Sequence, residues 1–221
     1  MRTPILLLAG LCISTSMAIA QESEPLSRTI FKLSPQHFIH NSLKAGVERF
    51  NQNHTGSVAV FLTGRLESKQ ESAFDDGYNG LAGELQFRKY ISPMKALTSK
   101  HGKAYYQGIY GAAYLQGGSY SGEFRDEYSY YDPNTGQYVT QYQYDYHESV
   151  GNWGLGFTIG YQKTLWQVIF MEAFIGGGIQ FSDKTTSGNP PAPDTYDYSG
   201  IVDPDYKGIL PKIGLHIGIG L

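Results

Sequence analysis

The sequence predicts an all-β protein, an eight-stranded antiparallel up-and-down transmembrane β-barrel with short periplasmic turns and longer outer loops. Three observations support this prediction. Apolar and polar side chains alternate by residue number, most regularly in residues 153–162 and 208–221. The chain begins with an export signal, and the links between the alternating segments differ in length. Successive side chains of a strand point to opposite faces, and a membrane barrel is apolar outward and polar inward.

The export signal is expected to occupy residues 1–20. Arg2 provides the positive start, residues 5–13 form a short apolar core, and Ala18 and Ala20 are small residues at the spacing of a cleavage site. The apolar core is too short for a transmembrane helix, which needs roughly 20 residues. We therefore expect a signal peptide (residues 1–20), a short lead (residues 21–28) and the barrel itself (residues 29–221), with cleavage near Ala20.

The composition excludes several classes of protein. Cys12 is the only cysteine and lies in the signal, so the mature chain has neither a disulfide framework nor a catalytic thiol. The chain has 17 basic and 20 acidic residues, which is not the balance of a nucleic-acid-binding protein. No stretch after residue 20 has the length and apolar character of a transmembrane helix. A membrane protein of this sequence must therefore cross the membrane with strands.

Eight segments have the alternation or composition of strands. In chain order they are residues 29–33, 42–50, 56–67, 81–91, 104–115, 153–162, 167–181 and 208–221. The first segment is short and ends at a Ser34-Pro35 bend. Residues 104–115 are the least regular, because Ile109 and Leu115 fall out of phase. Phe61, Phe170 and Phe174 likewise lie on the polar side of their segments, which weakens the pattern there.

The links alternate between short and long. Residues 51–55 and 163–166 are short and are expected at the periplasmic end. Residues 116–149 and 184–206 are long and are expected to form outer loops, the first rich in tyrosine and the second rich in proline. Residues 141–146 alternate, which is consistent with a hairpin that extends beyond the membrane.

The inward faces of these strands collect charged side chains. The inward set consists of Lys44, Arg65, Arg88 and Lys212, of Glu48, Glu84 and Glu172, and of His216. An eight-stranded barrel is just wide enough for side chains to fill its interior. Because charges in so confined a space cost desolvation energy unless they are paired, we expect an ion-pair network that plugs the barrel. The alternative is a narrow ion path through the same residues.

Aromatic residues near the strand ends are expected at the membrane interface, where an aromatic ring with a polar tip is favoured. Tyr161 and Trp166 fit the periplasmic side, and Trp153 fits the outer side. The same location is expected for the tyrosines of the fifth segment, which are Tyr106, Tyr110 and Tyr114.

No catalytic, cofactor or metal site is expected. His147, Glu148 and Ser149 are the one set that resembles a hydrolase constellation, and their spacing is also that of polar residues at a strand end. An acidic cluster near the C-terminus offers oxygen ligands for calcium but lacks the spacing of a known calcium loop, so we expect solvated loop charge. It consists of Asp194, Asp197, Asp203 and Asp205.

Four short motifs resemble a family of small eight-stranded outer-membrane β-barrel proteins, a domain-of-unknown-function family from Gram-negative bacteria. The motifs are Leu43-Lys-Ala-Gly-Val-Glu-Arg-Phe50, Gly83-Glu-Leu-Gln-Phe-Arg-Lys-Tyr90, Lys103-Ala-Tyr-Tyr-Gln-Gly-Ile-Tyr110 and Gly208-Ile-Leu-Pro-Lys-Ile-Gly-Leu-His-Ile-Gly218. The resemblance covers most of residues 29–221 and implies a membrane-embedded barrel without an established activity. Such barrels usually end in an aromatic residue that the assembly machinery reads, whereas this chain ends in Leu221.

These observations favour a non-enzymatic integral outer-membrane protein with a structural role or a surface-interaction role. Its expected partners are membrane lipids, the outer-membrane assembly machinery and a surface component that contacts the tyrosine-rich outer loops. Nucleic acid is not an expected partner. Two alternatives remain open at this point: a soluble periplasmic barrel that binds an apolar ligand, as a lipocalin does, and a lipid-modifying barrel enzyme of the outer membrane.

Overall fold

The structure is a computed structural model, and it describes residues 28–52, 55–66, 77–91, 108–165, 169–189 and 204–220. Within these ranges the side chains of residues 40, 125–130 and 140–145 are not described. The predicted signal peptide, most of the lead, and Leu221 lie outside the described residues. Tyr106 and Trp166 lie outside them as well.

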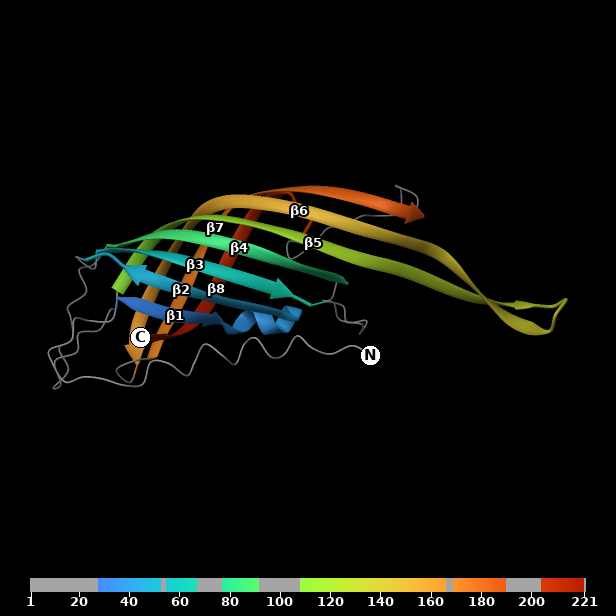
Figure 1. The fold of residues 1–221 in the computed structure, drawn as a ribbon, viewed down its shortest axis with the longest axis horizontal. Coiled ribbons are helices and arrows are strands. Elements are labelled where there is room, and N and C mark those ends of the chain that lie inside the picture. The colour runs from blue at the N-terminus through green and yellow to red at the C-terminus, as the bar shows by residue number, and fades with distance from the viewer. Residues whose placement is uncertain are drawn as a thin grey trace.

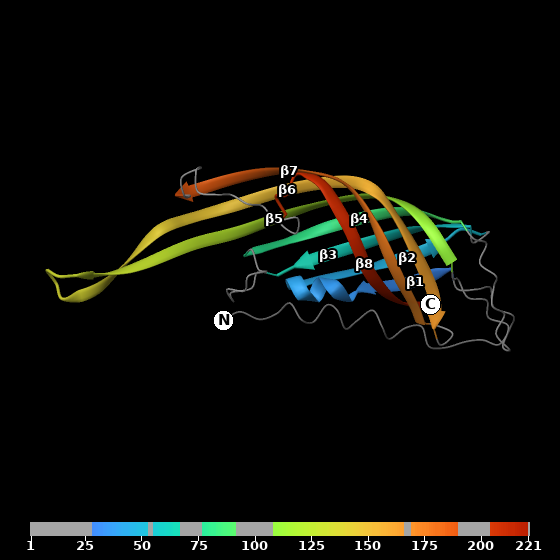
Figure 2. The same cartoon turned by 180° about the vertical axis from the view of Figure 1, so that it is seen from behind.

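Eight antiparallel strands form a closed barrel in chain order, as Figures 1 and 2 show from opposite sides. The strands are β1 (Thr29–Ser34), β2 (Ser42–Phe50), β3 (Gly56–Arg65), β4 (Tyr78–Tyr90), β5 (Gly108–Asp132), β6 (Gln137–Leu165), β7 (Ile169–Asn189) and β8 (Gly208–Gly220). A short 3-10 helix, η1 (Pro35–His40), occupies the predicted bend after β1. The barrel closes where β1 pairs with β8, from Ile30 opposite Gly220 to Leu33 opposite Ile217. The predicted eight-stranded antiparallel barrel is therefore confirmed.

The aromatic residues that break the alternation lie inside the barrel. Phe61, Phe170 and Phe174 are buried there, so they fill the interior and do not indicate an irregular strand. Tyr110 and Tyr114 are 0% and 4% exposed and also lie inside. The expectation that these two tyrosines occupy the membrane interface is wrong.

Glycines of β6 explain why the two tyrosines fit inside. Tyr110 lies opposite Gly160, and Tyr114 lies opposite Gly156. A Cβ atom at either glycine would overlap the hydroxyl of the tyrosine that lies across it. The missing side chains of β6 therefore provide the space that the rings occupy.

Strands β5 and β6 continue as a long hairpin beyond the rest of the barrel (Figure 1). The pairing of β4 with β5 stops at Gly122, and that of β6 with β7 stops at Asp145. The hairpin continues to a tight turn between Asp132 and Gln137, with a register shift after Asp126. The expectation of an outer loop over residues 116–149 is therefore wrong, because residues 116–132 belong to β5 and residues 137–149 belong to β6. The extended hairpin that the alternation of residues 141–146 indicated is present.

The proline-rich link is also shorter than expected, because β7 continues through residues 184–189. Among the described residues, no helix has the length and apolar character needed to cross a membrane.

Candidate functional site

The interior of the barrel is filled in layers from one end to the other. At the end where β2 finishes, which we call the closed end, an apolar cluster occupies the interior. It consists of Ile30, Phe50, Tyr90, Tyr110, Ala112 and Phe170. We call the opposite end, where β2 begins, the open end. Polar side chains occupy the interior between the closed end and the open end.

The layer next to the closed end is a buried ion-pair cluster, which we call the central cluster. It consists of Lys32, Glu48, Arg88, Glu172 and His216. The Lys32 ammonium pairs with both Glu48 and Glu172. Arg88 Nη1 lies 2.8 Å from Glu172 Oε2 and 3.3 Å from Glu48 Oε2. Two cations thus share two carboxylates, and the formal charge of the four groups is balanced.

Neutral donors complete the hydrogen bonding of these carboxylates. The Tyr110 hydroxyl donates to Glu172 Oε1 over 2.5 Å, and the Tyr90 hydroxyl donates to Glu48 Oε1 over 3.1 Å. The hydroxyl of Ser57 also donates to Glu48. A buried carboxylate is tolerated only when such partners replace its water, so this layer is built to hold its charges in place.

His216 lies between two phenylalanine rings in the same layer. Its ring centroid is 4.7 Å from that of Phe61 and 4.8 Å from that of Phe174. Its Nδ1 atom lies 3.0 Å from Glu172 Oε1. The out-of-phase phenylalanines of β3 and β7 therefore hold the one inward histidine of β8 against its carboxylate.

A second group of charges, which we call the upper cluster, lies nearer the open end. It consists of Lys44, Glu84 and Lys212. Both lysines pair with Glu84, and the Lys212 contact measures 2.7 Å from Nζ to Oε1. Lys212 Nζ also donates to Gln116 over 3.0 Å and lies 3.7 Å from the centroid of the Tyr114 ring.

Gln86 links the two clusters. Its amide nitrogen donates to Glu84 Oε1 over 2.6 Å, and its amide oxygen accepts from Arg88 Nε over 2.7 Å. The charged interior is therefore one connected hydrogen-bonded network that crosses β1, β2, β4, β7 and β8.

All eight inward residues predicted from the sequence have side chains directed into the barrel. Seven of them belong to the two clusters, and Arg65 is buried nearer the open end. Lys32 was not predicted. Its even number matches the parity of the inward residues in β2 and β8, so the alternation contains the signal, although β1 has only six residues in which to recognise it.

A cavity of about 240 Å³, with both polar and apolar residues in its lining, lies at the open end, above the upper cluster. Its charged lining residues among those described are Lys44, Arg65 and Glu84. The remaining polar lining comes from His37, Ser42, Thr63, Gln116, Tyr120, Asn152 and Gln180.

The rim of the open end carries a separate acidic group. The Tyr78 hydroxyl donates to Glu148, and Lys184 Nζ lies 3.5 Å from Glu148 Oε1 and 3.1 Å from Asp205 Oδ2. Asp205 was expected as solvated loop charge, and it pairs with Lys184 instead. The other three aspartates of that predicted cluster, Asp194, Asp197 and Asp203, lie outside the described residues.

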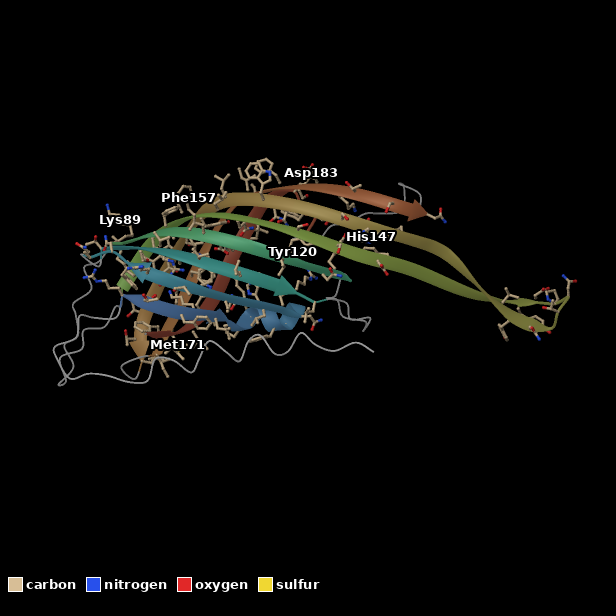
Figure 3. All side chains as sticks on the ribbon, in the orientation of Figure 1. Lys89, Tyr120, His147, Phe157, Met171 and Asp183 are labelled. Atoms are coloured by element: carbon tan, nitrogen blue, oxygen red, sulfur yellow. The ribbon has the colours of Figure 1, made fainter. Side chains whose placement is uncertain are left out.

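The three residues that resemble a hydrolase set are not brought together. Strand alternation directs Glu148 inward, whereas His147 and Ser149 are exposed on the outer face of β6 (Figure 3 labels His147). Ser149 Oγ lies 3.3 Å from His147 Nε2. Within the described part of the chain, no carboxylate is hydrogen-bonded to His147, so this pair has no acidic third member there.

The predicted interfacial aromatics that the structure describes face outward. Trp153 is 50% exposed and stacks on Phe181 of β7, with ring centroids 4.4 Å apart. Tyr161 is 48% exposed and lies on β6, as Trp153 does, but nearer the closed end.

No group of three or more histidine, cysteine, aspartate or glutamate side chains within the described ranges has the arrangement of a metal site. Comparison of the chain with known proteins finds no matching family model, no matching curated protein and no matching solved structure.

Proposed function

We propose that the protein is a non-enzymatic integral outer-membrane β-barrel. The observation that carries this proposal is the apolar outer face. Every strand contributes a large apolar side chain to it, each at least 42% exposed: Phe31, Leu43, Val60, Phe87, Leu115, Phe157, Ile175 and Ile213. Soluble proteins rarely expose a continuous apolar patch larger than a few hundred Å², because such a surface is costly in water. Lipid is the solvent that favours it.

The dimensions of the apolar surface support the same proposal. On β8 the outward apolar residues extend from Ile209 to Ile219, which is the length of about 9–11 residues that a tilted transmembrane strand needs. Polar outward residues lie near both limits of this surface. At the closed end they include Arg49, Lys89 and Lys163, and at the open end they include Asn79, Ser119 and Asp183, of which Figure 3 labels Lys89 and Asp183. Polar groups at both limits suit the headgroup layers of a bilayer.

The interior argues against the soluble lipocalin-like alternative. A barrel that carries an apolar ligand through water needs an apolar interior cavity and a polar outer face. Here the central and upper clusters occupy the interior, and charged and amide side chains form part of the lining of the cavity at the open end. The distribution of polarity is the reverse of what a lipocalin needs.

The β5–β6 hairpin suggests where a surface role would lie. It projects from the open end, and its tip exposes Tyr131 and Tyr138, whose ring centroids are 5.6 Å apart. Exposed tyrosines provide large contact areas at a low cost in side-chain entropy. The proposal therefore places the open end outside the cell and gives the hairpin the contacts with other surface components.

Fractionation of cells that express the full chain tests the membrane proposal. We expect the protein in the outer-membrane fraction after a carbonate wash, with detergent needed to release it. Recovery in the soluble periplasm without detergent would contradict the proposal and favour the soluble alternative.

A lipid-modifying enzyme is the second candidate, because Ser149 Oγ lies 3.3 Å from His147 Nε2 on the outer face near the open end. Mass spectrometry of outer-membrane lipids, with and without the gene, separates it from the first. A lipid change that needs the gene and is lost in Ser149→Ala would favour the enzyme. Unchanged lipids would leave the non-enzymatic barrel as the better account.

A further inference from the structure

We infer that the cavity at the open end is a binding site for a small oxyanion of the phosphate or carboxylate type. The charges of the interior are not distributed evenly between the two clusters. In the central cluster, Lys32 and Arg88 are matched by Glu48 and Glu172. In the upper cluster, Lys44 and Lys212 share the single carboxylate of Glu84. The excess of positive charge among these paired groups therefore lies beside the cavity.

Burial makes this excess costly. Lys44 and Glu84 are buried, and Lys212 is part-buried. A charge withdrawn from water without a full counter-charge loses solvation free energy that nothing else replaces. An anion that enters the cavity would supply the missing negative charge where the two lysines share one partner.

The rest of the cavity wall is suited to the same ligand. Arg65 also lines the cavity, and Glu84, which Lys44 and Lys212 share, is the only acidic residue among the described lining residues. The acidic residues of the rim, Glu148 and Asp205, do not line the cavity and pair with Lys184. The electrostatic potential inside the cavity is therefore expected to be positive.

Hydrogen-bond donors lie around this positive wall. The amide of Asn152 donates to Pro204 O over 2.9 Å, and that of Gln116 donates to Gln180 Oε1 over 3.2 Å. A side-chain amide has two N–H donors, so each of these groups retains a second one for a ligand. Together with the Thr63 hydroxyl, they provide the polar contacts that an oxyanion needs once its water is removed.

The size of the cavity suits a small anion, and its position makes it a blind site, with no path past the described side chains that fill the barrel below it. Its volume of about 240 Å³ is well above the about 30 Å³ that one water occupies, so a phosphate-sized anion and some water fit together. The two charged clusters and the apolar cluster fill the interior from the cavity to the closed end. An anion that enters from the open end would therefore be held rather than conducted.

Titration of the detergent-purified full chain with inorganic phosphate tests this inference. Calorimetry at constant ionic strength is expected to show saturable binding with one phosphate per barrel. Sodium acetate, titrated separately, distinguishes a preference for phosphate from one for carboxylates. Wild-type protein that shows no saturable binding of either anion would overturn the inference.

Two substitutions of opposite sign make the test specific. Lys44→Met removes a cation from the wall and is expected to weaken binding about ten-fold or more, because a hydrogen bond to a charged group contributes about 1.5–3 kcal/mol. Glu84→Gln removes the competing carboxylate and is expected to tighten binding. Equal weakening by both substitutions would indicate a structural effect and overturn the inference.

Two further substitutions distinguish the loss of a contact in the cavity from a general effect on folding. Thr63→Val keeps the shape of a wall residue and deletes its hydroxyl, so it is expected to weaken binding without a change of net charge. Lys89→Met makes the same change of net charge on the outer face at the closed end, away from the cavity, and should leave phosphate binding unchanged. A loss of binding in Lys89→Met equal to that in Lys44→Met would contradict the assignment to this cavity.

Discussion

Replacement of Ile213 by lysine tests whether the outer face of the barrel is in contact with a bilayer or with water. Ile213 is 78% exposed and lies near the middle of the outward apolar residues of β8. A lysine at the bilayer midplane of a β-barrel costs about 2–4 kcal/mol, whereas one near the interface costs about 0–1 kcal/mol. Ile209, at the open end of the same strand, is 76% exposed and serves as the matched control.

The structure sets the separation in depth between the two positions. Four residues of strand extend about 13 Å, and a tilt of about 45° reduces this to about 9 Å of depth. Since the apolar band of a membrane barrel is about 25 Å tall, a position near its middle and one 9 Å away differ strongly in polarity. We expect Ile213→Lys to lower the free energy of unfolding by about 2–3 kcal/mol more than Ile209→Lys does.

Urea unfolding in lipid vesicles, followed by tryptophan fluorescence, measures this difference. A gap of about 2–3 kcal/mol corresponds to about a 30- to 140-fold change in the unfolding equilibrium constant. In water the two substitutions should have the same small effect, because the two side chains are equally exposed. Equal effects in vesicles would therefore refute the argument that the outer face meets lipid.

Three further predictions concern the interior and the hairpin. Gly160→Ala is expected to cost about 1–3 kcal/mol by overpacking the tyrosine across it, whereas Gly111→Ala, with no atom within 4 Å of the added Cβ, should cost much less in the same unfolding assay. Glu172→Ala leaves buried cations without their carboxylate and is expected to cost about 3–5 kcal/mol; a loss below 1 kcal/mol would contradict the importance of the central cluster. At the exposed hairpin tip, the backbone amide of Asn134 donates to the Asp132 carboxylate over 2.9 Å and lowers the pKa of that group. We therefore expect the turn to keep this hydrogen bond at every pH above the usual aspartate pKa of about 3.9, and to lose it as the pH falls through the lower pKa of Asp132 in the folded protein. An NMR titration of the Asn134 amide with a midpoint at or above about pH 3.9 would contradict this.

Most of the strands could be predicted because alternation is a local property. In β8 each outward residue from Ile213 to Ile219 is separated from the next by glycine or histidine, so a short window of sequence identifies both the strand and its two faces. The same rule directed Lys212 and His216 into the interior. Local alternation needs no knowledge of which strand lies beside which.

The position of the β5 tyrosines is not fixed by local alternation. An outward position near a membrane interface and an inward position both suit a tyrosine, because its ring is apolar and its tip is polar. The choice depends on the residue across the strand pair. Gly160 lies 50 residues after Tyr110 and Gly156 lies 42 residues after Tyr114, and only the register of β5 with β6 places them opposite each other.

The hairpin was predicted only in part, from the alternation of residues 141–146. Residues 123–144 lie beyond the pairing of β4 with β5 and of β6 with β7, where the ribbon has no barrel interior to face. Because little of this ribbon needs an apolar face, its composition resembles that of a loop. Its backbone pairing with itself, visible only in the structure, makes it a pair of strands.

Local alternation identifies the strands, the apolar face of each long strand, and an opposite face with enough charge to need pairing. Which charges pair with which depends on the closure of the barrel. Lys44, Glu84 and Lys212 come from β2, β4 and β8, far apart in the chain, and meet because the sheet closes on itself. Closure places three distant strands around one narrow interior, where the strength of each charge interaction depends on distances that no local pattern contains.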